Sequence, residues 1–229
     1  MPLTDFKLIT HSGEKSISVE VKDLVIAGWT GRNKDAMEKH MAELEAIGIQ
    51  RPKTAPIFYR VSANLLTQNK VISVVGEDSS GEVEFFVLND GGTLYMGVGS
   101  DHTDRNVEAY NVTVSKQLCE KPISNSLWLY DDVVGHWDDI ILRSYAIENE
   151  ERCLYQEGPI TTMLPLEDLV QRYNGGSKEL QSNTLMFCGT LSVIGGVRPI
   201  EAFEIELEDP VLSRKIFHKY SIQTLPNEG

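Results

Sequence analysis

The chain has 229 residues, 41% of them hydrophobic and 24% charged, which is the composition of an ordinary globular protein with a sizeable core. Its 21 Lys and Arg against 34 Asp and Glu give a formal net charge of −13, which repels phosphate backbones and anionic headgroups, so neither nucleic acid nor a membrane is an expected partner. Without an apolar run of about 18 residues or a Cys-x-x-Cys spacing among Cys119, Cys153 and Cys188, the sequence predicts a cytoplasmic protein with free thiols, no disulfide framework and no zinc site.

The beginning of the chain predicts a small β-layer followed by a helix. Residues 6–27 carry three short runs that are apolar or alternate apolar with polar side chains. Asn33 then fits the N-cap position of a helix that runs to about residue 46. We expect residues 1–50 to form this layer and helix, and residues 51–229 to form a metal-binding β-core in the same single domain, because no linker divides the chain.

The predicted helix carries a candidate catalytic pair. His40 and Glu43 are i,i+3 neighbours that can touch. A glutamate that accepts from one imidazole nitrogen raises the basicity of the other, so His40 could serve as a general base for water. The alternative is a partly exposed histidine beside a surface glutamate. Gly31 and Gly48 flank the helix and would let it move as a lid.

Glu82-Val83-Glu84 stands at the head of an apolar run that predicts a strand. Strand side chains alternate faces, so both carboxylates would point the same way, roughly 6–7 Å apart along the strand. Such a pair is unfavourable unless a cation lies between the carboxylates, and a hard divalent ion with oxygen ligands is the usual solution. The alternative is an ordinary solvated sheet face.

A third acidic residue is expected beside this pair. After a turn at Asp90-Gly91-Gly92, a second strand at residues 93–98 would run back antiparallel and bring Asp101 close to the start of the first strand. Asp101 opens a dense polar run that ends at Arg105, and loops after strands often carry function. Arg105 could orient a ligand carboxylate or clamp a substrate carboxylate.

The rest of the chain predicts mostly strands. Residues 106–114 are strand-like, whereas residues 129–145 and 164–173 carry helical stripes. Residues 184–190 predict another strand and residues 203–225 a hairpin. Many strands with few helices favour an α+β fold that is mainly β.

Two further polar positions have both a functional and a structural interpretation. Lys116 is either a solvated lysine or a cation for a substrate oxyanion. Thr190, after Gly189 at the end of an apolar strand, either satisfies a turn or binds a carboxylate through its hydroxyl and backbone N–H.

The order of these pieces resembles the fumarylacetoacetate hydrolase superfamily, and in particular a distant, uncharacterised bacterial branch of it. The pieces are His40-Met41-Ala42-Glu43, Pro56-Ile57-Phe58-Tyr59-Arg60, Glu82-Val83-Glu84, Asp101-His102-Thr103-Asp104-Arg105, Lys116 with Pro122, and Gly189-Thr190. The match runs from about residue 28 to the C-terminus.

The resemblance implies a pseudo-barrel of rolled β-sheets with a few peripheral helices, usually a homodimer. It implies Mg²⁺ or Mn²⁺ held by Glu82, Glu84 and Asp101, and a small substrate with a 2-oxo-carboxylate head. The His40–Glu43 pair would handle water or a proton. The residues implied to bind the substrate carboxylate and oxyanion are Lys116, Arg105, Thr190, Gly189 and Arg60.

The resulting hypothesis is a metal-dependent hydrolase that cleaves a C–C bond in an acylpyruvate-like 2-oxo acid. Decarboxylation, isomerisation or hydration of a 2-oxo acid is the alternative within the same chemistry, since it needs the metal and Lys116 but not the histidine pair. A non-catalytic small-molecule-binding protein and a purely structural β protein are alternatives from other classes.

Overall fold

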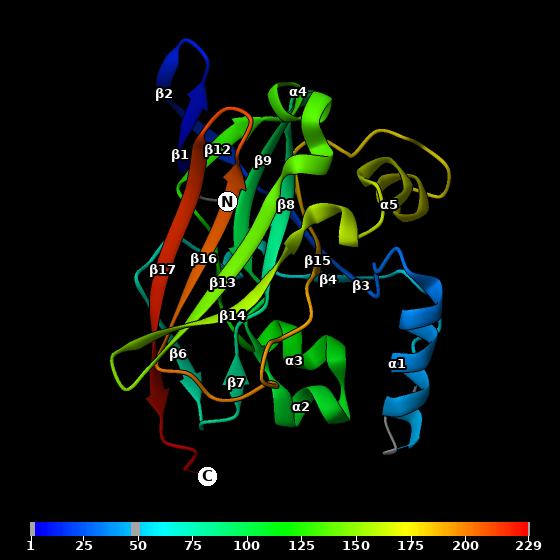
Figure 1. The fold of residues 1–229 in the computed structure, drawn as a ribbon, viewed down its shortest axis with the longest axis vertical. Coiled ribbons are helices and arrows are strands. Elements are labelled where there is room, and N and C mark those ends of the chain that lie inside the picture. Colours follow the sequence, from blue (N-terminus) through cyan, green and yellow to red (C-terminus); the bar gives the residue numbers. More distant parts are fainter. Residues whose placement is uncertain (1–2, 47–50, 229) are drawn as a thin grey trace.

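The computed structural model describes residues 3–46 and 51–228, and only the backbone of His40, Glu43, Leu44 and Ala46. Two sheets contain most of the strand residues of the described chain (Figure 1). The eight-stranded sheet has the order β2 (Gly13–Glu20), β1 (Leu3–Thr10), β12 (Ser126–Leu129), β9 (Thr93–Ser100), β8 (Val83–Asp90), β15 (Thr184–Thr190), β3 (Asp23–Gly28) and β4 (Ile57–Val61). The five-stranded sheet has the order β14 (Glu151–Pro159), β13 (Ile141–Glu148), β16 (Ala202–Asp209), β17 (Arg214–Leu225) and β6 (Val71–Val75).

Short elements complete the described chain. Two strand pairs join β10 (Thr103–Asp104) to β7 (Ser79–Ser80), and β11 (Lys121–Pro122) to β5 (Leu66–Thr67). The α-helices are α1 (Lys34–Ala46), α2 (Arg105–Tyr110), α3 (Val112–Leu118), α4 (Tyr130–Val133) and α5 (Leu166–Tyr173). The 3-10 helices are Ala63–Leu65, Val134–Asp139 and Ile160–Thr162. None of the described helices is long and apolar enough to span a membrane.

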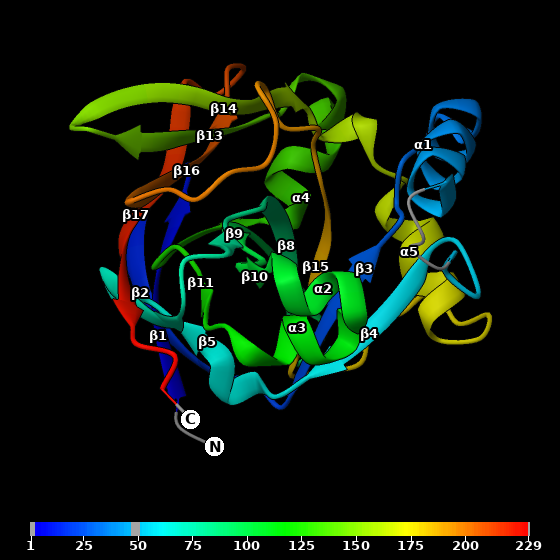
Figure 2. The same ribbon diagram turned by 90° about the horizontal axis from the view of Figure 1, so that it is seen from below.

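The larger sheet curls, so that β1 and β2 lie on one side of the molecule and β3 and β4 on the other (Figure 2). Phe85 and Val87 of its central strand β8 pack in the core between the two sheets, whereas Phe86 and Leu88 pack in a second core formed almost entirely by the curled sheet itself. Because both faces of β8 are buried, its sequence is a continuous apolar run. The expected mainly β, rolled-sheet architecture is therefore confirmed.

The hairpin predicted at the centre of the chain is confirmed. Gly91 and Gly92 form its turn with φ of +59° and +91°, a backbone conformation that glycine adopts at little cost. Strands β8 and β9 then pair antiparallel from Asp90 opposite Thr93 back to Val83 opposite Ser100. This register brings Asp101, which follows Ser100, next to Glu82, which precedes Val83.

The strand predicted at residues 106–114 is wrong, because α2 and α3 occupy this segment. The Asp104 side chain caps α2 by accepting from the Val107 backbone N–H at 2.9 Å. Asn111 separates the helices and caps α3 by accepting from Val114 N–H at 3.1 Å. Two capping side chains override the weak alternation of the sequence, since each satisfies a backbone donor at a helix start. Helix α3 packs against β4 and β10.

The long helix predicted at residues 129–145 is also wrong. Helix α4 leads into the 3-10 helix Val134–Asp139, which is interrupted at His136, and β13 begins at Ile141. Strand β13 lies between β14 and β16, so tertiary pairing decides its conformation. The helix predicted at residues 164–173 is confirmed as α5, and the C-terminal hairpin as β16 and β17.

Candidate metal centre and active site

Three carboxylates converge at the start of β8. Glu82 directly precedes this strand, Glu84 is its second residue, and Asp101 follows β9. Asp101 N–H donates to Glu82 carbonyl oxygen at 3.0 Å, which continues the ladder beyond the strand ends. One carboxylate oxygen from each residue lies within 4.8 Å of the others. The structure therefore brings together the three residues that the sequence predicts as metal ligands.

Two buried lysines compensate the charge of Asp101. Lys116 Nζ, from α3, contacts Asp101 Oδ2 directly and lies 3.6 Å from Glu82 Oε2. Lys121 Nζ, from β11, lies 3.0 Å from Asp101 Oδ1 and donates to the His102 carbonyl oxygen at 2.6 Å. The Lys116 and Lys121 side chains are 7% and 0% exposed, so their charges act across little water.

Arg105, at the start of α2, adds a third cation. Its Nη1 donates to Glu82 Oε1 at 3.0 Å and to Glu108 Oε2 at 2.7 Å, and its Nε donates to Ser80 Oγ at 2.7 Å. Arg105 therefore orients a predicted metal ligand, one of the two roles expected from the sequence. Four carboxylates, those of Glu82, Glu84, Asp101 and Glu108, then face three cations.

The pKa values of the acids diverge within this cluster. Burial raises the pKa of Glu84 well above its usual range, and the negative charges of Asp101 and Glu82 raise it further. Burial also acts to raise the pKa of Asp101, but Lys116 and Lys121 outweigh it and lower this pKa to about 2. Burial acts to lower the pKa of Lys116, but the negative charges of Asp101 and Glu82 outweigh this desolvation and raise the pKa.

The donor set fits a hard divalent cation such as Mg²⁺ or Mn²⁺. All three candidate ligands are carboxylates, and a spacing within 4.8 Å suits oxygens that lie about 2.0–2.1 Å from a shared ion. Asp101 Oδ1 is buried and has no hydrogen bond: Lys121 lies within ion-pair distance but not in hydrogen-bond geometry. Lys121 compensates the charge of this oxygen, but without a hydrogen bond its lone pairs remain free to bind a metal cation. The assignment of the ligands stays a prediction.

The end of β15 supports the ligands from behind. Gly189 N–H donates to Glu84 Oε2 at 2.6 Å, and Thr190 Oγ1 donates to the Val83 carbonyl oxygen at 2.8 Å. Gln156, fully buried, donates to Thr190 Oγ1 at 2.8 Å and accepts from Val83 N–H at 3.1 Å. These bonds fix the backbone between Glu82 and Glu84, so Gly189 and Thr190 hold the ligands here, and their predicted role in substrate binding stays a prediction.

Arg60, predicted to bind substrate, is not part of this cluster. The Arg60 guanidinium pairs with Asp23 and its side chain is 62% exposed. Strand alternation instead turns Tyr59 toward the site, where Lys116 Nζ lies 5.8 Å from its ring centroid. The side chains of His40 and Glu43 lie outside the described residues, as does Gly48, so their roles stay predictions.

Sequence reasoning missed Lys121, Glu108 and Gln156. Glu108 is three residues after Arg105, a spacing that makes contact on a helix, but the segment was expected to be a strand. The only signal for Lys121 is its position before Pro122, and Gln156 lies in a strand that the sequence did not predict.

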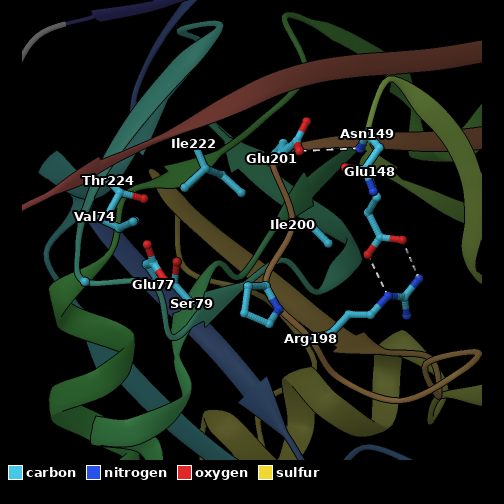
Figure 3. A pocket seen from close by; sticks show the side chains of 12 residues that line it. Val74, Glu77, Ser79, Glu148, Asn149, Arg198, Ile200, Glu201, Ile222 and Thr224 are labelled. Carbon is cyan, nitrogen blue, oxygen red and sulfur yellow. Dashed lines mark hydrogen bonds and ion pairs between the residues drawn. The ribbon is translucent and has the colours of Figure 1, made fainter.

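A separate pocket of about 540 Å³ is lined by residues of β6, β7, β13 and β17 and of the loops beside them (Figure 3). Its lining includes Glu77, Ser79 and Arg198, and Arg198 is paired with Glu148 at 2.6 Å. Ser79 Oγ also lies 3.0 Å from His102 Nε2, but none of the lining residues belongs to the carboxylate cluster.

The sequence profile of DUF2848, described as a protein of unknown function, matches residues 27–220. The chain belongs to the DUF2848 family. No curated protein matches the sequence. This family membership is in keeping with the uncharacterised branch expected from the sequence.

Solved structures of the fumarylacetoacetate hydrolase type share the fold of this DUF2848 protein. A yeast fumarylacetoacetate hydrolase family protein is 13% identical with a TM-score of 0.64, covering 91% of this chain and 95% of its own. A Burkholderia cenocepacia protein provisionally assigned as a fumarylpyruvate hydrolase is 16% identical with a TM-score of 0.66, covering 99% and 94%. A 2-keto-3-deoxy-D-arabinonate dehydratase complexed with magnesium and 2,5-dioxopentanoate is 11% identical with a TM-score of 0.64, covering 96% and 79%. The resemblance to this superfamily is thus confirmed at the level of the fold.

Proposed function

We propose that this chain is a divalent-metal enzyme that acts on a small 2-oxo carboxylate. The observation that carries the proposal is the convergence of Glu82, Glu84 and Asp101 within 4.8 Å, backed by two buried lysines. The dehydratase that shares the fold was solved with magnesium and a 2-oxo acid, which supports the same chemistry here. The homodimer and the cytoplasmic location inferred from the sequence stay predictions.

Each group in the cluster has a defined task under this proposal. Glu82, Glu84 and Asp101 would hold Mg²⁺ or Mn²⁺, which when bound supplies a Lewis acid for the oxygens of the 2-oxo-carboxylate head. Lys116 holds Asp101 in place and offers a cation to negative charge that develops on the substrate oxygens. Lys121 anchors the Asp101–His102 backbone, and Arg105 fixes Glu82.

Hydrolytic C–C cleavage is the reaction we propose, with the His40–Glu43 pair of α1 as the base that activates water. Figures 1 and 2 show α1 at the side of the sheets, and under this proposal the helix acts as a lid over the cluster. A decarboxylase, isomerase or hydratase is the second candidate, because a dehydratase shares this fold and such reactions do not require the histidine pair.

Elemental analysis of the purified protein tests the metal site. We expect Mg²⁺ or Mn²⁺ at about one ion per chain, lost in Glu82→Ala and retained in Glu151→Ala, which removes an exposed glutamate at the start of β14. A screen of oxaloacetate and acylpyruvates with the loaded protein then tests turnover. A metal content equal in both variants would refute the site, and bound metal without turnover of any 2-oxo acid would favour a binding protein.

A further inference from the structure

Glu108 is the acidic side chain of the cluster that is most accessible from outside. Side-chain exposure rises from 0% at Asp101 to 17% at Glu82 and 28% at Glu108. Helix α2, which carries Glu108, lies beside α3 at the end of the molecule where β7 also lies (Figure 1). Glu108 therefore forms the outer rim of the cluster, one guanidinium group away from Glu82.

Arg105 offers the rim little accessible positive charge, because its Nη2, which has no hydrogen-bond partner among the described residues, is buried. Its Nη1 is shared between Glu82 and Glu108, and its Nε is bound to Ser80 Oγ. Of the contacts found within the described residues, none involves Glu108 Oε1, which remains an acceptor. If the carboxylate head of a substrate binds at the metal centre beside Lys116, the tail of that substrate would therefore lie near the negatively charged acceptor Glu108 Oε1.

Such a rim discriminates between tails by charge and by hydrogen bonding. A carboxylate on the tail is repelled by Glu108 across a partly desolvated gap, where charges interact more strongly than in water. A hydroxyl group is a donor and can be accepted by the same oxygen. The net charge of −13 adds a weaker, salt-screened repulsion of dianions.

We propose that Glu108 selects 2-oxo acids with an uncharged, hydroxylated tail and excludes those with a second carboxylate. This inference rests on the proposed function, since it takes the 2-oxo-carboxylate head to bind at the metal centre. It names a specificity-determining residue, and it narrows the substrate class to hydroxylated 2-oxo monocarboxylates.

Calorimetric binding to the Mg²⁺-loaded protein at one salt concentration tests the proposal. Three probes share one carbon skeleton and differ at the tail: 2-oxovalerate, 5-hydroxy-2-oxovalerate and 2-oxoglutarate. We expect 2-oxoglutarate to bind about tenfold more weakly than the hydroxylated probe, and Glu108→Gln to remove this factor, which corresponds to about 1.4 kcal/mol. Glu151→Gln makes the same change of net charge at an exposed position on β14, and it should retain the wild-type ratio.

The ratio of affinities separates selection from a structural role. If Glu108 only orients Arg105, Glu108→Gln weakens all three probes by the same factor, and this result overturns the proposal. A wild-type preference for 2-oxoglutarate also overturns it, and this measurement needs no variant, so an unstable Glu108→Gln protein leaves the test in force. If the protein binds 2-oxovalerate but does not discriminate between the other two probes, the Glu108 proposal is overturned and the proposed function remains intact. If none of the probes binds, both the Glu108 proposal and the proposed function are overturned.

Discussion

A single glycine illustrates how much of the site depends on backbone conformation. Gly189 has φ of +106°, a region that residues with a Cβ rarely adopt, and a Cβ added there would lie 1.8 Å from Thr30 Oγ1. In this conformation its N–H reaches Glu84 Oε2 at 2.6 Å. Because position 189 has no side chain, the buried Thr30 hydroxyl can lie close to the Gly189 backbone. For the same reason the buried Glu84 carboxylate can accept a hydrogen bond from the Gly189 N–H.

Replacing Gly189 by alanine should therefore destabilise the fold and disturb the metal centre. We expect Gly189→Ala to lose about 2–4 kcal/mol of unfolding free energy, from the strained φ and the overlap with Thr30, and to bind Mn²⁺ more weakly. Gly31→Ala is the matched control, because a Cβ at Gly31 would meet nothing within 4 Å. Urea denaturation of both variants checks the expectation, which fails if the two lose the same stability.

Strand β16 shows how one element combines a core face with a charged face. Phe203, Ile205 and Leu207 point into the core, whereas the alternating Glu204, Glu206 and Glu208 form ion pairs with neighbouring strands. The paired cations are Arg143 on β13, Arg152 on β14, and Lys215 and Lys219 on β17. A strand of this composition is stable in the sheet because both faces have partners.

These ion pairs predict a loss of stability in acid. Hydrogen bonds from Arg143 lower the pKa of Glu208; burial acts to raise the pKa of Glu204, but Arg152 and Lys219 outweigh it and lower that pKa. A carboxyl group whose pKa is lower in the folded than in the unfolded state stabilises the fold above its unfolded pKa, and this contribution disappears as the pH falls through the folded pKa. We therefore expect the unfolding free energy to decrease below about pH 4.

Arg143→Met tests this assignment by removing a partner of Glu208 and Glu206. The variant should lose less stability than the wild type when the pH is lowered from about 6 to about 3, as measured by urea denaturation at each pH. Arg172→Met, at an exposed position in α5, should retain the wild-type pH dependence. Identical pH profiles for the wild type and Arg143→Met would contradict the prediction.

At the scale of the whole molecule, the candidate site joins segments far apart in the sequence. Its carboxylates precede β8 or lie within it and follow β9, its lysines come from α3 and β11, and its backbone donor comes from β15. Apart from Glu82 and Glu84, which are separated by one residue, the three carboxylates come together only when the chain folds. A metal that needs all three carboxylates therefore binds the folded state and stabilises it by mass action.

Metal addition should accordingly raise the unfolding temperature. At about 100 times the Kd, Mg²⁺ or Mn²⁺ should add about 2.7 kcal/mol to the stability of the wild-type protein. Glu84→Gln, which keeps the shape but removes one ligand charge, should show a much smaller shift. Thermal unfolding of both proteins with and without the ion gives the answer, and equal shifts in the two would exclude this site as the cause.

The sequence by itself determined the features that depend on local periodicity and on turn chemistry. The β8–β9 hairpin followed from an apolar run, a Gly-Gly turn and a second run, and it carried the pairing of Glu82 with Asp101. Strand β15, helix α5 and the C-terminal hairpin had equally clear patterns. The fold class could therefore be predicted from the sequence. The acidic triad could also be predicted, because short-range register determines which residues are neighbours in a hairpin.

Only the tertiary structure decided the contacts that surround this triad. Residues 106–114 form parts of two helices instead of the predicted strand, because Asp104 and Asn111 cap the helix starts. This helical conformation places Glu108 beside Arg105. Lys121 is buried against Asp101 because β11 pairs with β5, and Gln156 reaches β15 because the two sheets pack face to face. Such contacts join residues with no shared periodicity, so their geometry is set by packing across the whole chain and not by the segments themselves.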